Sequence, residues 1–179
     1  MQADWTSWIA PGLFLALLAV AAISDIARRK IPNWAVLALI AVWIGAAIAG
    51  QAIGPWYLAL AAAVIAFAIG YLLYHFGLMG AGDAKLFTAG ALFANLAWLF
   101  QFSLITALFG GVLAIGYLLV RPKKVMRGLT AKGRAEALKS SSGIPYGVPI
   151  AMAAALTAYL NTFLAPLFYR APVATTPLF

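Results

Sequence analysis

The sequence of 179 residues contains no cysteine, one histidine and only four acidic residues. Without cysteine the chain can form neither a disulfide nor a thiolate metal site, and one histidine is too few for a His-rich zinc site. Charged residues make up 9% of the chain, whereas a soluble domain carries about a quarter. We therefore predict no large soluble domain, no metal site and no required cofactor.

What the chain has in abundance is apolar sequence, which makes up 65% of its residues. One helical span needs about 20 apolar residues, so the chain can hold about six. The runs lie at about 8–26, 34–49, 56–76, 84–96, 102–120 and 144–168. The sequence thus predicts an all-α polytopic membrane protein with six transmembrane helices in a single domain over residues 1–179. The division between the fourth and fifth runs rests only on Asn95 and Gln101.

The basic residues predict how these helices are oriented. A net charge of +8 can indicate nucleic-acid binding, but every Lys and Arg except Arg170 falls in the loops at 27–33, 77–85 and 121–142. Six alternating spans place these loops on one side of the membrane, and positively charged loops stay in the cytoplasm. We therefore predict both termini outside, a basic cytoplasmic loop at 121–142, membrane lipid as a partner and no nucleic acid. The expected location is the inner (plasma) membrane.

The four acids are distributed unevenly. Asp4 precedes the first apolar run and Glu136 lies in the basic loop, whereas Asp25 and Asp83 lie at the edges of the first and fourth runs. The predicted topology places these two edges on the same side. Acids near the hydrocarbon are costly and usually face a polar interior. A structural interpretation stays open for each: Asp83 as a helix cap, and Asp25 as a surface ion pair with the arginines after it.

Two close carboxylates have a specific chemistry. Like charges a few ångströms apart cannot both ionise cheaply, so one keeps its proton. The ionised group can then take a proton from water while the protonated group donates to a carbonyl oxygen, which hydrolyses an amide without a covalent intermediate. A proton- or cation-coupled transporter is the alternative, but it favours acids near the bilayer midplane. A non-catalytic assembly factor is a third possibility.

Three segments carry a resemblance to a known family. Gly80-Ala81-Gly82-Asp83 matches the GxGD signature of intramembrane aspartyl proteases, and its continuation resembles the bacterial type IV prepilin peptidases. Asp25 followed by Arg28-Arg29-Lys30-Ile31-Pro32-Asn33 is similar to the first catalytic segment of that family. The segment 142–149, Ser-Gly-Ile-Pro-Tyr-Gly-Val-Pro, resembles the motif that opens the last helix.

The resemblance implies that Asp25 and Asp83 form a catalytic dyad on the cytoplasmic side. The implied substrate is a prepilin with a short basic leader, a small residue before the scissile bond and a hydrophobic helix. Larger relatives carry a CxxC-containing segment and also N-methylate the new terminus, and this cysteine-free chain resembles the compact, peptidase-only branch associated with Flp-type pili. We therefore expect no methyltransferase activity, and no oligomeric state is predicted.

The same motifs indicate residues that support the site. The glycines of the signature either let backbone approach a substrate or partner helix, or merely permit a turn. The lysine two residues after Asp83 either biases the dyad toward ionisation or extends to the headgroups. The Pro-Tyr-Gly segment could keep backbone groups available for an extended substrate strand. The supporting residues are Gly80, Gly82, Lys85, Pro145, Tyr146 and Gly147.

Overall fold

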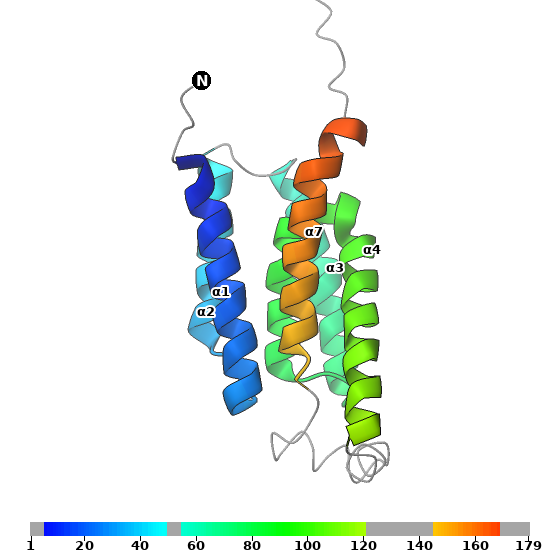
Figure 1. Ribbon diagram of the computed structural model, residues 1–179. Helices are drawn as coiled ribbons and strands as arrows, with labels where there is room; N and C mark the ends of the chain where they lie inside the picture. The colour runs from blue at the N-terminus through cyan, green and yellow to red at the C-terminus, as the bar shows by residue number, and fades with distance from the viewer. Residues whose placement is uncertain (1–5, 50–54, 121–144, 169–179) are drawn as a thin grey trace, which may run out of the picture.

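The computed structural model describes residues 6–49, 55–120 and 145–168, and the regular structure in these ranges is entirely α-helical. The helices are α1 (Thr6–Arg28), α2 (Asn33–Ile48), α3 (Trp56–His75), α4 (Ala81–Val120) and α7 (Gly147–Phe168), which lie side by side in Figure 1. The predicted all-α class is confirmed. Four helices match the predicted runs at 8–26, 34–49, 56–76 and 144–168 to within a few residues. The predicted loop at 121–142 and both chain ends lie outside the described residues.

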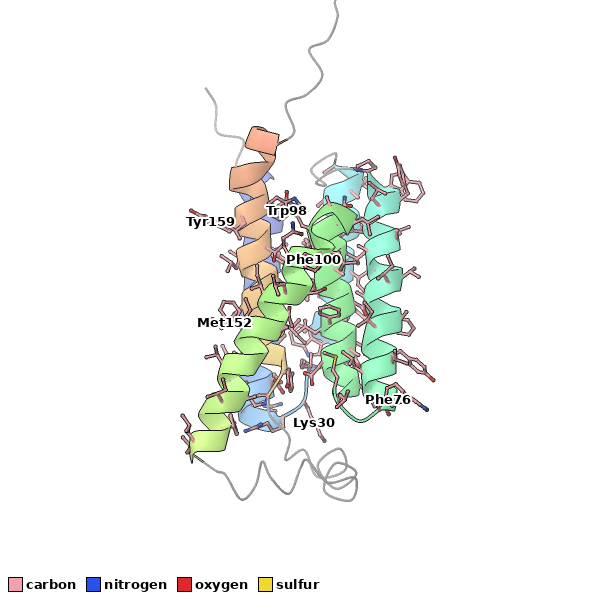
Figure 2. All side chains as sticks on the ribbon, turned by 90° about the vertical axis from the view of Figure 1, so that its right-hand side faces the viewer. Lys30, Phe76, Trp98, Phe100, Met152 and Tyr159 are labelled. Carbon is pink, nitrogen blue, oxygen red and sulfur yellow. The ribbon has the colours of Figure 1, made fainter. Side chains whose placement is uncertain are left out.

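The helices have the length and surface of membrane spans. Three stretches, Ile9–Arg28, Trp56–His75 and Ala81–Tyr117, are long and apolar enough to cross a bilayer, while α2 and Gly147–Asn161 are apolar but shorter. Large apolar side chains also cover the outside of the bundle, as Figure 2 illustrates for Phe100, which is 74% exposed. Apolar surface of this extent marks contact with a partner or a membrane. The chain is therefore a membrane protein.

Helix α4 consists of two arms that meet at Asn95. This residue has φ 60° and ψ 171°, which interrupts the helical path, and the chain turns back there (Figure 1). The ring of Phe87 in the first arm stacks on Phe102 in the second with 4.9 Å between centroids. In a straight helix these residues would be about 22 Å apart. Gly90 makes the close packing possible, because a Cβ there would lie 2.8 Å from Phe102 Cζ.

The position of this break corrects the sequence-based boundaries. The predicted interruption between 96 and 102 is wrong, because Asn95 alone makes the reversal and the second arm continues to Val120. With ψ 171° this conformation lies in a region that glycine alone adopts readily, and the Oδ1 of Asn95 accepts a hydrogen bond from Leu96 N–H. Helix α4 also begins at Ala81 rather than at residue 84.

Helix α4 is the centre of the bundle. Its arms pack against α3 and α7, while α1 packs against α2 and α7. Much of the core consists of alanine, including fully buried Ala62, Ala66 and Ala153. Small side chains let helices approach closely where the surrounding lipid supplies no hydrophobic drive. As a result, the C-terminal end of α1 and the N-terminal ends of α4 and α7 meet at the lower end of the bundle in Figure 1.

Candidate active site

Asp25 lies at this lower end, three residues before α1 finishes, and only 5% of it is exposed. Its Oδ2 accepts a hydrogen bond of 2.8 Å from the backbone N–H of Gly147, the first residue of α7. The N-terminus of a helix carries a partial positive charge that favours an anion. A Cβ on residue 147 would lie 2.8 Å from the same carboxylate oxygen. Glycine is therefore required for α7 to begin directly against Asp25.

Asp83 occupies the first turn of α4 and is part-buried. Its Oδ2 accepts a hydrogen bond of 3.3 Å from Gly80 N–H, while Ala84 N–H donates to Gly80 O at 3.0 Å. A third-position carboxylate that reaches back to the residue before the helix is half of a capping box. Asp83 thus caps the helix, but from its third position and toward Gly80, and not as the N-cap residue that the sequence suggested. The carboxylate also lies within electrostatic range of Asp25.

Ile31 joins the three motif segments. A Cβ on Gly82 would lie 3.3 Å from Ile31 Cβ, and a Cβ on Gly147 would lie 2.9 Å from Ile31 Cδ1. Gly77 is the only glycine of the described ranges with a positive φ, so backbone freedom does not explain Gly80 or Gly82. Of the two interpretations of these glycines, close approach describes Gly82. The neighbour that approaches is the Ile31 side chain.

Pro145 and Tyr146 directly precede α7, next to Gly147. Pro145 is buried and Tyr146 is half-buried. A Cβ on Gly110 of the second arm of α4 would lie 3.0 Å from Tyr146 Cε1, so the ring packs on that glycine. Burial, and then the negative charge of Asp83, raise the pKa of the Tyr146 hydroxyl above its ordinary value. The hydroxyl therefore stays protonated at neutral pH, close to the carboxylates.

The remaining predicted support residues have more specific contacts than their motifs suggested. Lys85 Nζ donates a hydrogen bond of 3.1 Å to Asn33 Oδ1, which connects α4 to the first residue of α2. Gly147 N–H is bound to Asp25, so it is engaged within the protein. The predicted pairing of this segment with a substrate strand would have to use other backbone groups.

Two further residues at this end were not identified as site residues from the sequence. Arg29 Nη2 donates a hydrogen bond of 2.5 Å to the hydroxyl of Tyr117 in the last turns of α4. Arg29 lies inside one of the motif segments, so that segment was its only signal. Tyr117 lies in an apolar run with no motif around it, and no pattern in the sequence pointed to it.

One comparison with known proteins gives a match. The model of the type IV leader peptidase family matches residues 12–115, more than half of the chain. The chain belongs to the type IV leader peptidase family. No significant match was found among the curated proteins or among the solved structures. Membership supports a role as a leader peptidase.

The matched range includes both aspartates and ends before Tyr117 and α7. The structure nevertheless brings α7 to the same place, because Gly147 binds Asp25. In this leader peptidase family member, the candidate site therefore extends beyond the matched range. It combines the end of α1, the start of α4 and the start of α7.

Proposed function

We propose that this chain is an aspartic prepilin peptidase that removes the leader from Flp-like type IV pilin precursors at the cytoplasmic face of the inner membrane. The observation that carries the proposal is the meeting of Asp25 and Asp83 at one end of the bundle, within electrostatic range of each other. Family membership supports leader cleavage as the reaction. The substrate would present a basic leader to the cytoplasm and its hydrophobic helix to the membrane.

The proposed mechanism uses a water molecule and both carboxyl groups. The ionised aspartate takes a proton from water as the water oxygen attacks the scissile carbonyl carbon, and the protonated aspartate donates its proton to the carbonyl oxygen. The resulting gem-diol collapses as the C–N bond breaks. The amine nitrogen receives the proton that came from water, and the second aspartate recovers its proton from a hydroxyl. The cycle needs no metal and no organic cofactor.

The proposed topology has six crossings, with the two arms of α4 counted separately and both termini outside. Lys30 and Lys85 lie in segments at the same end of the bundle as the dyad, which supports a cytoplasmic location for that end. In this arrangement residues 1–179 form one membrane-embedded domain, and the loop at 121–142 is cytoplasmic. We also propose that the chain lacks methyltransferase activity.

The position of the acids does not favour the transporter alternative. A proton or cation pathway requires ionisable groups along the depth of the membrane. Asp25 lies in the last turn of α1 and Asp83 in the first turn of α4. Both are at helix ends, where a hydrolase of a membrane-anchored substrate needs access to water.

The test is cleavage of co-expressed prepilins by wild type, Asp25→Asn and Asp83→Asn. Asparagine preserves the size of the side chain but cannot exchange protons, so each variant should leave the prepilin at full length while the wild type shortens it. Asp4→Asn is the matched control, because it removes the aspartate that lies outside the apolar runs. Membrane insertion of each variant is measured by immunoblot of the membrane fraction.

Each result has a clear meaning. Cleavage by either dyad variant at the wild-type rate would show that its aspartate is structural and that the aspartic mechanism is wrong. A wild type that cleaves no prepilin from a broad panel, including Flp-like ones, would refute the proposed activity. Equal loss in Asp4→Asn would show that the assay reports expression and not catalysis.

A further inference from the structure

Arg29 stands at an unusual place on the backbone. It directly follows α1, has φ 54°, and its N–H donates to the carbonyl oxygen of Asp25 at 2.9 Å. This is the αL termination of a helix, a position that glycine usually occupies. A side chain in this conformation costs roughly 1–2 kcal/mol. A non-glycine residue at this position therefore indicates that its side chain makes contacts that offset the backbone strain.

Those contacts lead across the site to α4. The guanidinium donates to Tyr117 Oη and lies 5.6 Å from the centroid of the same ring. One tyrosine thus supplies both a hydrogen-bond acceptor and a cation–π partner. The contact links the end of α1 to the end of the second arm of α4. It holds the positive charge where it acts on the carboxylate of Asp25.

Burial disfavours the anion of Asp25, and two neighbouring groups counter that burial. Arg29 acts from its own helix end, and Gly147 N–H donates from the positive end of α7. Helix α2, which also packs on α1, has no titratable side chain. The titratable groups of α4 at this end are Asp83, Lys85 and Tyr117, of which Tyr117 is bound to Arg29. The segment before α7 adds Tyr146.

The groups around Asp83 are less favourable to a second negative charge. Its described hydrogen bond is the longer one, 3.3 Å, from Gly80 in its own helix turn. The nearest cation in sequence, Lys85, is hydrogen-bonded to Asn33. Asp83 also faces the charge of Asp25. The two carboxyl groups therefore have unequal surroundings.

We propose that Arg29, held by Tyr117, is a positioning residue that keeps Asp25 as the ionised member of the pair, so that Asp25 activates water and Asp83 supplies the proton. This assignment rests on the proposed peptidase function and specifies the roles that the function leaves open. Arg29 itself touches no reacting atom in this scheme. It acts through the charge state of Asp25.

The first measurement is a direct titration. The chain has only three aspartates, Asp4, Asp25 and Asp83, so full-length protein labelled with ¹³C at the aspartate carboxyl carbon gives three signals, which single Asp→Asn variants assign. Asp25 should ionise at lower pH than Asp83. In Arg29→Gly its ionisation midpoint should rise by about one pH unit, the low end expected for loss of a neighbouring opposite charge.

Substitutions at this end of the bundle distinguish a positioning role of Arg29 from a purely structural role. Arg29→Gly should unfold near the wild-type temperature, because glycine adopts the positive φ without strain while the contact with Tyr117 is lost. Tyr117→Phe keeps the ring and loses the acceptor, so the midpoint should move in the same direction by less, and Arg29→Lys should restore part of the shift. Arg28→Gln removes a neighbouring exposed charge and should leave the midpoint unchanged.

Turnover supplies the second measurement. The acidic limb of the kcat profile for prepilin cleavage should move to higher pH in Arg29→Gly, with about tenfold lower kcat below that limb and little change in KM. An unmoved Asp25 midpoint, an equal shift in Arg28→Gln, or Asp83 ionising first would each overturn the inference. A titration as expected from a wild type that cleaves no prepilin would support the charge assignment and refute the proposed function.

Discussion

Replacement of Gly147 by alanine is the sharpest test of how the site is built. The added Cβ would lie 2.8 Å from Asp25 Oδ2, 2.9 Å from Ile31 Cδ1 and 3.1 Å from Asp25 Cβ. The end of the Ile31 side chain can rotate away, but the buried Asp25 is fixed to the same residue by the N–H hydrogen bond. Relief of the overlap must therefore lengthen that bond or move the start of α7.

The magnitude follows from the two contacts. Forcing an additional carbon into a packed interior costs about 1–3 kcal/mol of stability, and a hydrogen bond to a charged group contributes about 1.5–3 kcal/mol. If the second amount is lost from the catalytic state, cleavage slows roughly ten- to a hundredfold. We therefore expect Gly147→Ala to insert into the membrane, unfold at lower temperature and cleave prepilin at a small fraction of the wild-type rate.

Alanine substitutions at two other glycines provide comparisons for the effect at Gly147. At Gly82 the new Cβ would lie 3.3 Å from Ile31 Cβ, so Gly82→Ala should cause a smaller loss of cleavage. Gly111→Ala meets nothing within 4 Å, and alanine has the higher helix propensity, so it should be neutral or slightly stabilising. The assay is the initial rate of prepilin cleavage in detergent, with thermal unfolding of the same samples. Wild-type cleavage by Gly147→Ala would refute the proposed contact between α7 and Asp25.

The remaining predictions concern the bundle. Asn95→Gly should preserve the α4 reversal. Asn95→Val should lower stability by roughly 1–2 kcal/mol, because a β-branched side chain is strained at a positive φ. Equal thermal unfolding of the two variants would show that the reversal does not depend on this residue. Phe102→Ala should cost about 3–5 kcal/mol in detergent, while the exposed Phe100→Ala should cost little, and equal losses would contradict the packing of the two arms. The chain has no cysteine, so single introduced cysteines can be labelled selectively. A membrane-impermeant maleimide added outside should label Ala49→Cys but not Arg28→Cys. The reverse pattern would overturn the proposed orientation.

Local sequence was sufficient for the class of structure and for most helix boundaries. The bounds of α2, Asn33–Ile48, follow an apolar run that begins after Pro32, and those of α3 follow one that begins after Pro55. Runs of this composition have few stable alternatives in a bilayer, because each backbone polar group must be satisfied within its own helix. The boundary inside α4 was placed wrongly because a single asparagine with a positive φ leaves the apolar pattern on both sides unchanged.

The two aspartates were likewise accessible from sequence, since they are the only acids at the edges of apolar runs. The groups that surround these aspartates could not be predicted from the sequence. The hydrogen bond from Gly147 spans 122 positions of the chain, and the one from Arg29 to Tyr117 spans 88. No local pattern encodes a contact of that separation, because it depends on how the helices pack.

The sequence by itself therefore determined a helical membrane protein, the candidate residues for acid–base chemistry and the family to which they point. The tertiary structure alone decided which distant groups lie beside Asp25. It brings the start of α7 and the Arg29–Tyr117 contact to that carboxylate. The physical reason is that charge state depends on distance and burial, and these exist only after the helices have packed.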